Sequence, residues 1–204
     1  YVLTQDKIKE IFIDKDKIQK KRILTIPKVG LVNGLFATAS GVGGITIIET
    51  YRSLSENRLS LELTGKQGDV MKESMRVAKT VAWNLLSKKQ QDKIRESTPY
   101  GIHIHCPEAA TPKDGPSGGA AITTVIYSLL SDRKINRNFA MTGEICLQGR
   151  VTAIGGLDLK ILGGIESGVT HFSYPKENEK DLVDMPKKII DEMMHHHFNY
   201  SIIV

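Results

Sequence analysis

The amino-acid sequence predicts a mixed α/β fold, with helices packed on mixed sheets that have a substantial antiparallel share. Short apolar runs that alternate with polar residues and end at glycines predict strands before residue 64. From Asp69 the apolar period changes to that of a helix, and both periods recur along the rest of the chain. A chain of 204 residues is long enough to bury a substantial core, and we expect most of it to form one domain.

Strands begin the body of the chain. Three are expected, and the glycine-rich turn 41–44 joins the first two as a hairpin: 29–39, 45–50 and 59–63. A helix then begins at Asp69, because five apolar side chains fall on one stripe: Met71, Met75, Ala78, Ala82 and Leu85. We expect this helix to fade near Ser87, in the polar stretch 88–95.

The second half of the chain alternates strands and helices. Gly115 and Pro116 mark the start of one expected helix, and Gly168 follows the end of another. Strands are expected over 101–106, 139–147, 150–154, 169–174 and 200–204, with the second and third of these paired around Gly149. Helices are expected over 116–131, 156–166, 177–182 and 186–194.

The formal charge of +5 is spread unevenly along the chain. Residues 1–22 hold seven Lys/Arg and four Asp/Glu, whereas residues 23–204 hold twenty-one and nineteen. A surface that binds nucleic acid needs clustered cations, so this interspersed body argues against nucleic acid as a partner. We expect residues 1–26 to be an arm, made of a helical end piece and a linker, and residues 27–204 to be the folded domain.

Composition also bears on the compartment. No apolar run approaches the roughly 20 residues that span a bilayer, and no signal-peptide pattern is visible. Cys106 and Cys146 form no short metal or redox motif, which favours two unpaired thiols in a reducing compartment. We therefore expect a cytoplasmic or organelle-matrix protein that is not secreted and has no membrane partner. The chain begins at Tyr1 without Met, so we expect Tyr1 to be a processing boundary.

Ser117 lies in a setting suited to chemistry. It follows Gly115 and Pro116 at the expected start of a helix, where the first amides have no internal partner. Such amides can stabilise an anion that forms on a substrate carbonyl, and Gly118 and Gly119 leave room for a peptide to approach. Pattern alone leaves open that Ser117 is only an N-terminal helix residue.

Lys160 is the matching candidate base. It falls about one turn into an expected helix, among Leu157, Ile161 and Leu162, and desolvation there lowers the pKa of an amine. A lysine that reaches out to solvent is the alternative. Ser–Lys pairs are an established variant of the Ser–His–Asp triad. Thr142 could hold the amine through its hydroxyl, or be an ordinary strand residue.

Other polar residues carry weaker signals. His103 and His105 alternate on an expected strand and so face one side; a structural role is favoured over a metal site, because no further ligand accompanies them, and pH sensing is the third reading. The histidines 195–197 are expected in an exposed loop, with no role assigned. Asp114 and Glu108 are candidate supporting groups, and Asp114 suits a turn equally well.

Two nucleotide-binding motifs are missing. The glycines at 41–44 lack the third glycine and the helix of a dinucleotide fingerprint, and Gln67 follows Gly65-Lys66 where a Walker A motif needs Ser or Thr. No cofactor or metal site is therefore expected in this domain.

Several separated stretches, in order, resemble the proteolytic domain of the ATP-dependent Lon protease family, in its Pro-Lys-Asp-Gly-Pro-Ser form. They are 63–74 (LTGKQGDVMKES), 112–117 (PKDGPS), 140–144 (AMTGE) and 155–160 (GGLDLK). The likeness extends from about Val29 to Val204, and residues 1–22 resemble the tail of the helical ATPase subdomain that precedes this domain in the family.

This resemblance implies an endopeptidase that degrades unfolded or damaged proteins. Ser117 would be the nucleophile, Lys160 the general base, Thr142 its hydroxyl partner and Asp114 a loop residue that gates the site. It also implies a hexameric ring in the full-length protein, and ATP with Mg²⁺ in an ATPase part outside this chain.

The sequence departs from the family pattern at three places. Gly118 replaces a usual Ala after the nucleophile, residues 157–159 replace a basic-acidic run, and a frequent Trp is missing near residues 35–37. None removes a catalytic atom. Two other classes of protein remain open: a scaffold domain of the kind found in DNA-repair ATPases, which the retained Ser117 and Lys160 argue against, and an unrelated Ser–Lys amidase, which the stretch at 64–74 argues against.

Overall fold

The computed structural model describes residues 4, 7, 22–24, 26–107, 115–183 and 185–198. In these residues seven strands form one sheet, in the order β3-β4-β2-β1-β5-β8-β9. The strands are β1 (Leu31–Ala37), β2 (Gly43–Leu54), β3 (Leu61–Thr64), β4 (Tyr100–His105), β5 (Phe139–Met141), β8 (His171–Pro175) and β9 (Met194–Phe198). A separate hairpin pairs β6 (Glu144–Ile145) with β7 (Val151–Thr152).

The large sheet is mixed, as predicted. Strand β2 runs antiparallel to both β1 and β4, whereas β3 is parallel to β4. On the other side of β1, the strands β5, β8 and β9 follow in parallel pairs. The predicted hairpin turn between the first two strands is confirmed, since the amide of Thr38 donates to the carbonyl of Val42.

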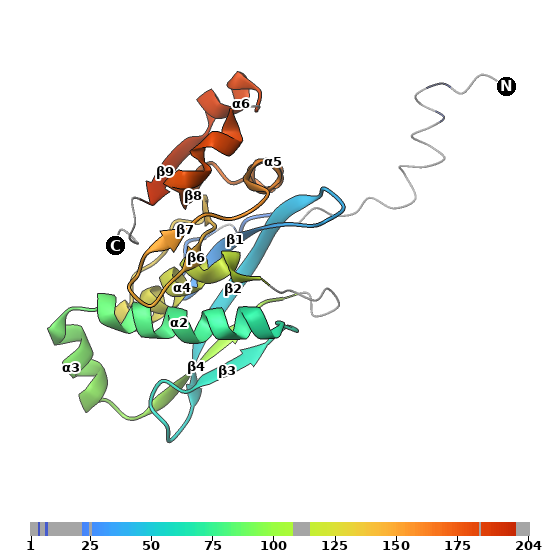
Figure 1. Cartoon of the computed structure of the whole chain (residues 1–204). Helices are drawn as coiled ribbons and strands as arrows, with labels where there is room; N and C mark the ends of the chain where they lie inside the picture. The colour runs from blue at the N-terminus through green and yellow to red at the C-terminus, as the bar shows by residue number, and fades with distance from the viewer. Residues whose placement is uncertain are drawn as a thin grey trace.

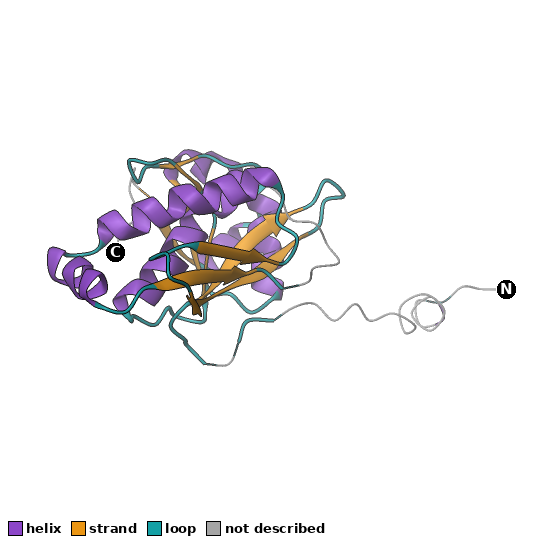
Figure 2. Ribbon diagram, turned by 90° about the horizontal axis from the view of Figure 1, so that it is seen from below, coloured by secondary structure: helices purple, strands orange, loops and turns teal. Residues whose placement is uncertain are grey.

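The helices pack around the sheet in separate groups (Figures 1 and 2). Figure 1 shows α5 and α6 gathered near β8 and β9, whereas α2 runs across the view above β3 and β4, with α3 beyond its left end. The helices are α2 (Asp69–Leu85), α3 (Lys88–Glu96), α4 (Gly119–Ser131), α5 (Leu157–Glu166) and α6 (Lys187–Glu192), with 3-10 helices η2 (Pro116–Gly118) and η3 (Lys176–Leu182). No helix in the described part of the chain is long and apolar enough to cross a membrane.

Two apolar cores hold the layers together. The first joins α2 and α4 to the sheet, and the predicted stripe of α2 supplies four of its buried members: Met71, Met75, Ala78 and Ala82. Leu85, the fifth residue of the stripe, is only partly buried. The second core joins α5 to the other part of the sheet through Leu157, Ile161 and Phe172. Ser117 comes shortly before Ala120 of the first core, and Lys160 lies between Leu157 and Ile161 of the second.

A close backbone contact sets α5 against the β1–β2 hairpin. A Cβ built on Gly163 would lie 2.1 Å from the carbonyl carbon of Gly43, and one on Gly43 would lie 1.8 Å from the carbonyl oxygen of Leu159. Only glycine at both positions permits this approach. The Gly163-Gly164 pair, which is unfavourable in an isolated helix, therefore serves packing here.

In the middle of the chain, the helix that begins at Asp69 ends at Leu85, close to the predicted end near Ser87. A second helix, which was not predicted, follows over the polar stretch 88–95, because Ser87 and Gln90 form a capping box that starts α3 although only Ile94 of this helix is buried. One strand prediction here is wrong. The single strand expected over 139–147 is instead split into β5 and β6. At the break the amide of Thr142 bonds to the carbonyl of Ser173, and the amide of Gly143 to that of Ser117.

The C-terminal prediction is wrong as well. The helix expected over 186–194 ends at Glu192, and the histidines 195–197 lie in strand β9 rather than in a loop. They extend the sheet because β9 pairs in parallel with β8. The strand expected over 200–204 lies outside the described residues, as do residues 1–3 and most of the predicted arm.

Candidate active site

Ser117 lies in η2, at the junction between a glycine turn and α4. Gly115 has φ of 137°, a backbone conformation that other residues rarely adopt, so the turn into Pro116 and Ser117 requires glycine. The carbonyl of Ser117 accepts the amide of Gly143 at 2.8 Å and the hydroxyl of Thr142 at 3.1 Å. The backbone of the candidate nucleophile is thus fixed by the break between β5 and β6.

Lys160 is buried at the first turn of α5, with 4% of its surface exposed. Leu157 and Ile161 beside it are fully buried, whereas Leu162 on the same helix is 38% exposed. The amine Nζ donates a hydrogen bond to Thr142 Oγ1 at 3.2 Å. The lysine therefore does not reach out to solvent, which was the alternative from sequence.

Burial changes the acid–base behaviour of this amine. Desolvation lowers the pKa of Lys160 from 10.5 to about 8. The charged ammonium loses hydration in the protein interior, so the neutral form is favoured. An amine with this pKa can accept a proton near neutral pH.

Thr142 connects the two candidates. Its hydroxyl has one hydrogen, and the geometry directs that hydrogen to the carbonyl of Ser117 while the oxygen accepts from Lys160. The amine therefore donates one N–H to Thr142, and the lone pair of the neutral amine stays available to accept a proton from another group. Within the described residues, no hydrogen bond joins Ser117 Oγ to Lys160 Nζ.

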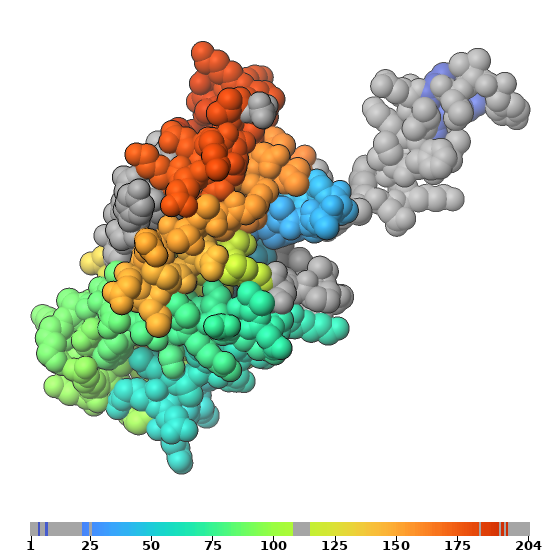
Figure 3. All heavy atoms as spheres, in the orientation of Figure 1, coloured from blue at the N-terminus to red at the C-terminus, as the bar shows by residue number. Residues whose placement is uncertain are grey.

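Ser117 and Lys160 line the same open cleft, whose volume is about 530 Å³. One wall is apolar, with Phe36 and Ala37 from the end of β1 and Ile154 from the segment after β7. Glu144 from β6 adds a carboxylate. In Figure 3 the β6–β7 segment (orange) lies on the surface between α2 (green) and the C-terminal elements (red). The cleft can hold an extended chain next to both candidates.

The amides expected to stabilise an oxyanion are partly engaged. The amide of Gly119 donates to the carbonyl of Pro116, and that of Ala120 to the carbonyl of Gly143. These two amides therefore serve the fold. The amides of Ser117 and Gly118 remain as candidates for binding an anion beside the serine hydroxyl.

The remaining sequence candidates divide into two groups. Asp114 and Glu108 lie outside the described residues. His103 and His105 do face one side, since Nε2 of the first and Nδ1 of the second lie 2.8 and 2.7 Å from Thr64 Oγ1. The described residues hold no cluster of three His, Cys, Asp or Glu side chains that suits a metal.

His195 bonds away from the cleft. Its Nδ1 lies 3.1 Å from the hydroxyl of Tyr174, a fully buried residue. Burial, with a smaller effect of the Glu179 charge, raises the pKa of Tyr174 to about 12. The pair links β9 to β8, and neither residue is among the described residues that line the cleft.

Sequence reasoning missed Gly143, Phe36 and Gly163. Each acts through a contact between residues far apart in the chain: Gly143 with Ser117, Phe36 in the cleft wall, and Gly163 with Gly43. The Ala-Met-Thr-Gly-Glu stretch carried a signal for Gly143, because a glycine after a strand threonine often marks a break.

A serine and a buried lysine of lowered pKa that share one cleft are the parts of a serine hydrolase. More particularly, the chain belongs to a protease family: a sequence model of the Lon protease (S16) C-terminal proteolytic domain matches residues 2–201. The chain is therefore a Lon-type serine protease domain, which excludes an unrelated amidase.

Known relatives agree with this membership. The chain is 44% identical over 181 residues to Lon protease 1 of Bacillus subtilis, covering 87% of this chain and 22% of that protein. It is 39% identical over 182 residues to a Lon protease homolog of Acanthamoeba polyphaga mimivirus (87% and 18%). It is 38% identical over 187 residues to a mitochondrial Lon protease homolog of Caenorhabditis elegans (89% and 19%). The chain spans about a fifth of the length of these relatives.

Proposed function

We propose that this chain is the proteolytic part of an ATP-dependent protease that hydrolyses peptide bonds in unfolded or damaged proteins. Ser117 is its nucleophile, Lys160 its general base and Thr142 the residue that positions the amine. The observation that carries the proposal is the buried Lys160 amine, held by Thr142 in the cleft that Ser117 also lines.

The reaction begins with proton transfer from Ser117 to Lys160. As Oγ attacks the peptide carbonyl, the hydroxyl proton passes to the neutral amine, and negative charge develops on the carbonyl oxygen. The peptide C–N bond then breaks, and the Lys160 ammonium returns the proton to the leaving nitrogen. A water molecule next attacks the ester, giving one proton to Lys160, and that proton returns to Ser117 as the acid product leaves.

Thr142 sets the direction of this proton transfer. Because its own hydrogen is used on the carbonyl of Ser117, it can only accept from Lys160. The amine lone pair then points elsewhere, and a turn of the Ser117 side chain brings its hydroxyl to that lone pair. The reactive arrangement thus differs from the one among the described residues by one hydrogen bond, from the Ser117 hydroxyl to the Lys160 amine.

The family and the shape of the cleft support a proposal for the substrate and the assembly. An extended chain suits a cleft with one apolar wall, and backbone hydrogen bonds to nearby strands would give broad selectivity. A hexameric ring, with ATP and Mg²⁺ acting in an ATPase part outside this chain, would unfold substrates and feed them inward. Asp114 would gate the nucleophile loop, and residues 1–26 would connect the two parts.

The compartment is proposed on the same basis. A Lon homolog of Bacillus subtilis is bacterial and that of Caenorhabditis elegans is mitochondrial. We place this protein in the cytoplasm or an organelle matrix, where the thiols of Cys106 and Cys146 would stay reduced.

Casein hydrolysis by the full-length protein, with and without ATP, tests the proposal. Ser117→Ala should lower the rate by several orders of magnitude. Lys160→Arg should also be inactive, because guanidinium stays protonated at any working pH. Activity of Ser117→Ala within about tenfold of the unchanged protein would remove Ser117 from its role.

The pH dependence of peptide hydrolysis gives a second test. Lys160 must be neutral to accept the proton, and its pKa is about 8. The rate should therefore rise about tenfold per pH unit up to pH 8 and level off above it. A flat profile from pH 6 to 10, together with an active Lys160→Arg variant, would contradict the assignment of the base.

A further inference from the structure

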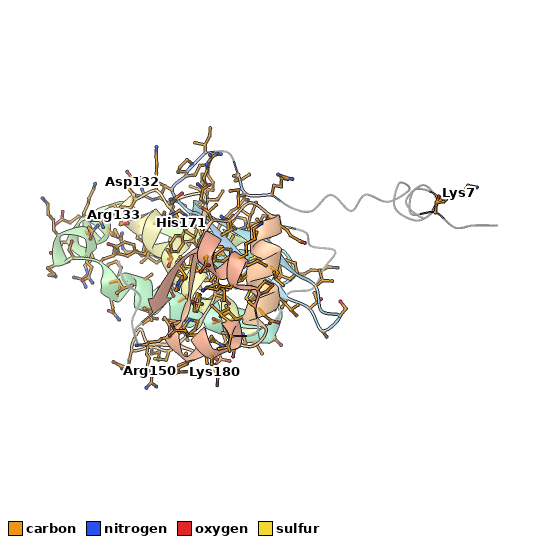
Figure 4. The ribbon with its side chains drawn as sticks, turned by 90° about the horizontal axis from the view of Figure 1, so that it is seen from above. Lys7, Asp132, Arg133, Arg150, His171 and Lys180 are labelled. Carbon is orange, nitrogen blue, oxygen red and sulfur yellow. The ribbon has the colours of Figure 1, made fainter. Side chains whose placement is uncertain are left out.

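A second pocket lies away from the catalytic cleft, where the ends of α3 and α4 meet β2 and β4. Its volume is about 410 Å³, and it shares no residue with the cleft that holds Ser117 and Lys160. Figure 4 labels Asp132 and Arg133, which follow the end of α4 at this side of the molecule. Nothing in the proposed reaction uses this pocket.

The pocket walls carry hydrogen-bond donors and positive charge. Arg52 of β2 and Lys93 of α3 are exposed cations, against one carboxylate, Asp132. The guanidinium of Arg52 lies 4.6 Å from the centre of the Tyr100 ring, which holds it in place. The net charge of these three side chains is positive, so an anionic ligand is favoured.

Tyr100 adds an unsatisfied donor. Only 9% of its surface is exposed, and its buried hydroxyl has no hydrogen-bond partner among the described residues. A buried hydroxyl without a partner lowers the stability of the fold, and a ligand that accepts its hydrogen bond would remove this cost. An acceptor bound between Arg52 and Tyr100 would satisfy it.

Acceptors and an apolar floor complete the pocket. Among the described residues, no backbone amide donates to the carbonyls of Leu129, Leu130 or Ser131 at the end of α4. Val29, Ile94 and the two leucine side chains supply apolar surface. The ligand should therefore present an anion, N–H donors and an apolar group within a short distance of one another.

We propose that this pocket binds the carboxyl terminus of an unfolded polypeptide that ends in an apolar residue. The terminal carboxylate lies between Arg52, Lys93 and the hydroxyl of Tyr100, and backbone amides of the peptide donate to the α4 carbonyls. The last side chain packs on Ile94 and Leu129. The inference rests on the proposed function, since it makes the pocket a docking site for substrates of the same protease.

Peptide binding to the full-length protein in a Ser117→Ala background tests the inference without cleavage. The probe is a fluorescein-labelled hexapeptide that ends in leucine, measured by anisotropy, beside the same peptide with an amidated end. The free carboxylate should bind about tenfold more tightly than the amide, because a charge-assisted bond is lost. Equal binding of the two peptides would overturn the inference.

Variants separate this pocket from the catalytic cleft. Arg52→Met should weaken binding of the free-carboxylate peptide about tenfold, and Lys93→Met several-fold. Lys89→Met is the matched control, an exposed lysine of α3 outside the pocket walls, and should bind as the parent does. Unchanged binding by both pocket variants would assign the peptide to another site and overturn the inference.

Tyr100→Phe distinguishes a ligand-binding hydroxyl from a structural one. Removal of an unpartnered buried hydroxyl should raise the melting temperature, and loss of its bond to the carboxylate should at the same time weaken binding about fivefold. A higher melting temperature with unchanged affinity would contradict a role in binding.

Competition by N-acetyl-leucine tests whether a small carboxylate is sufficient as the ligand. If N-acetyl-leucine displaces the labelled peptide as strongly as the unlabelled peptide does, the ligand is a free carboxylate and the polypeptide assignment fails.

The two proposals fail in different ways. If the protein with Ser117 intact does not cleave casein, the proposed function fails, whatever the peptide binds. If it cleaves casein while the Arg52 and Lys93 variants bind the peptide normally, only the pocket assignment fails.

Discussion

Replacement of Lys160 by methionine should stabilise the fold at neutral pH while abolishing activity. The pKa of this lysine falls from 10.5 to about 8 because the amine is buried. One pKa unit corresponds to about 1.4 kcal/mol, so holding the charged amine in the folded state costs roughly 3 kcal/mol. Methionine has no charge and similar length, and it loses only the hydrogen bond to Thr142, worth about 1 kcal/mol. The expected net gain is about 2 kcal/mol.

The sign of the pH dependence follows from proton binding. Below pH 8 the amine is protonated in both the folded and the unfolded state, so the full cost is present. Between pH 8 and 10.5 the unfolded state binds more protons than the folded state, and the stability of the lysine protein rises with pH. The advantage of Lys160→Met should therefore be largest below pH 8 and fade by about pH 10.5.

Urea denaturation from pH 6 to 10.5 measures this difference, in a Ser117→Ala background that prevents self-digestion. Lys89→Met, which removes an exposed lysine of α3, controls for the loss of a positive charge. The reasoning is refuted if Lys160→Met is less stable than its parent at pH 6, or if the difference in the free energy of unfolding stays constant over the range.

Four further substitutions, with Leu162→Ala as a control, test the contacts of the site and of α5. Thr142→Val should lower kcat by about 10- to 100-fold and cost about 1 kcal/mol of stability, because the Lys160 amine loses its acceptor while the amide of Gly143 still holds the Ser117 carbonyl; full turnover in a casein assay would make Thr142 a strand residue only. Gly118→Ala should stabilise the fold by about 0.5 kcal/mol, since a Cβ there meets only a side-chain carbon of Ile122 at 3.5 Å. Gly119→Ala should instead cost about 1–3 kcal/mol, since its Cβ would lie 2.9 Å from a backbone nitrogen; equal melting temperatures for the two alanine variants would contradict this contrast. Gly163→Ala should unfold the protein at a lower temperature and reduce hydrolysis, whereas Leu162→Ala on the exposed side of α5 should do neither.

Local signals in the sequence predicted the elements that depend on local physics. The stripe of α2 is visible because Met71, Met75 and Ala78 follow the helical period, and its buried face is the one predicted. Helix α3 lacks such a stripe, and its signal was the Ser87–Gln90 capping box, which an analysis of apolar period alone does not see.

The site was predictable in its residues but not in its connections. Ser117, Lys160 and Thr142 were selected as candidates from pattern and resemblance, and the structure brings all three together. The hydrogen bonds that do this cross long stretches of chain, from Thr142 to Ser117 and from Gly143 to Ser117, and they break the strand that period predicted. Strand propensity depends on neighbouring residues in the sequence, so it contains no information on these tertiary hydrogen bonds, which override it.

The base and the packing of its helix have one physical cause. Glycine in a helix interior costs about 1 kcal/mol relative to alanine, so Gly163 and Gly164 count against α5 as a local structure. They allow its backbone to reach that of Gly43, and this approach encloses Lys160 at 4% exposure. Enclosure is what lowers the pKa of the amine, and the lowered pKa is what a general base requires near neutral pH. The helix glycines and the buried charge both reduce stability, so we expect selection for hydrolysis, rather than for stability, to maintain them.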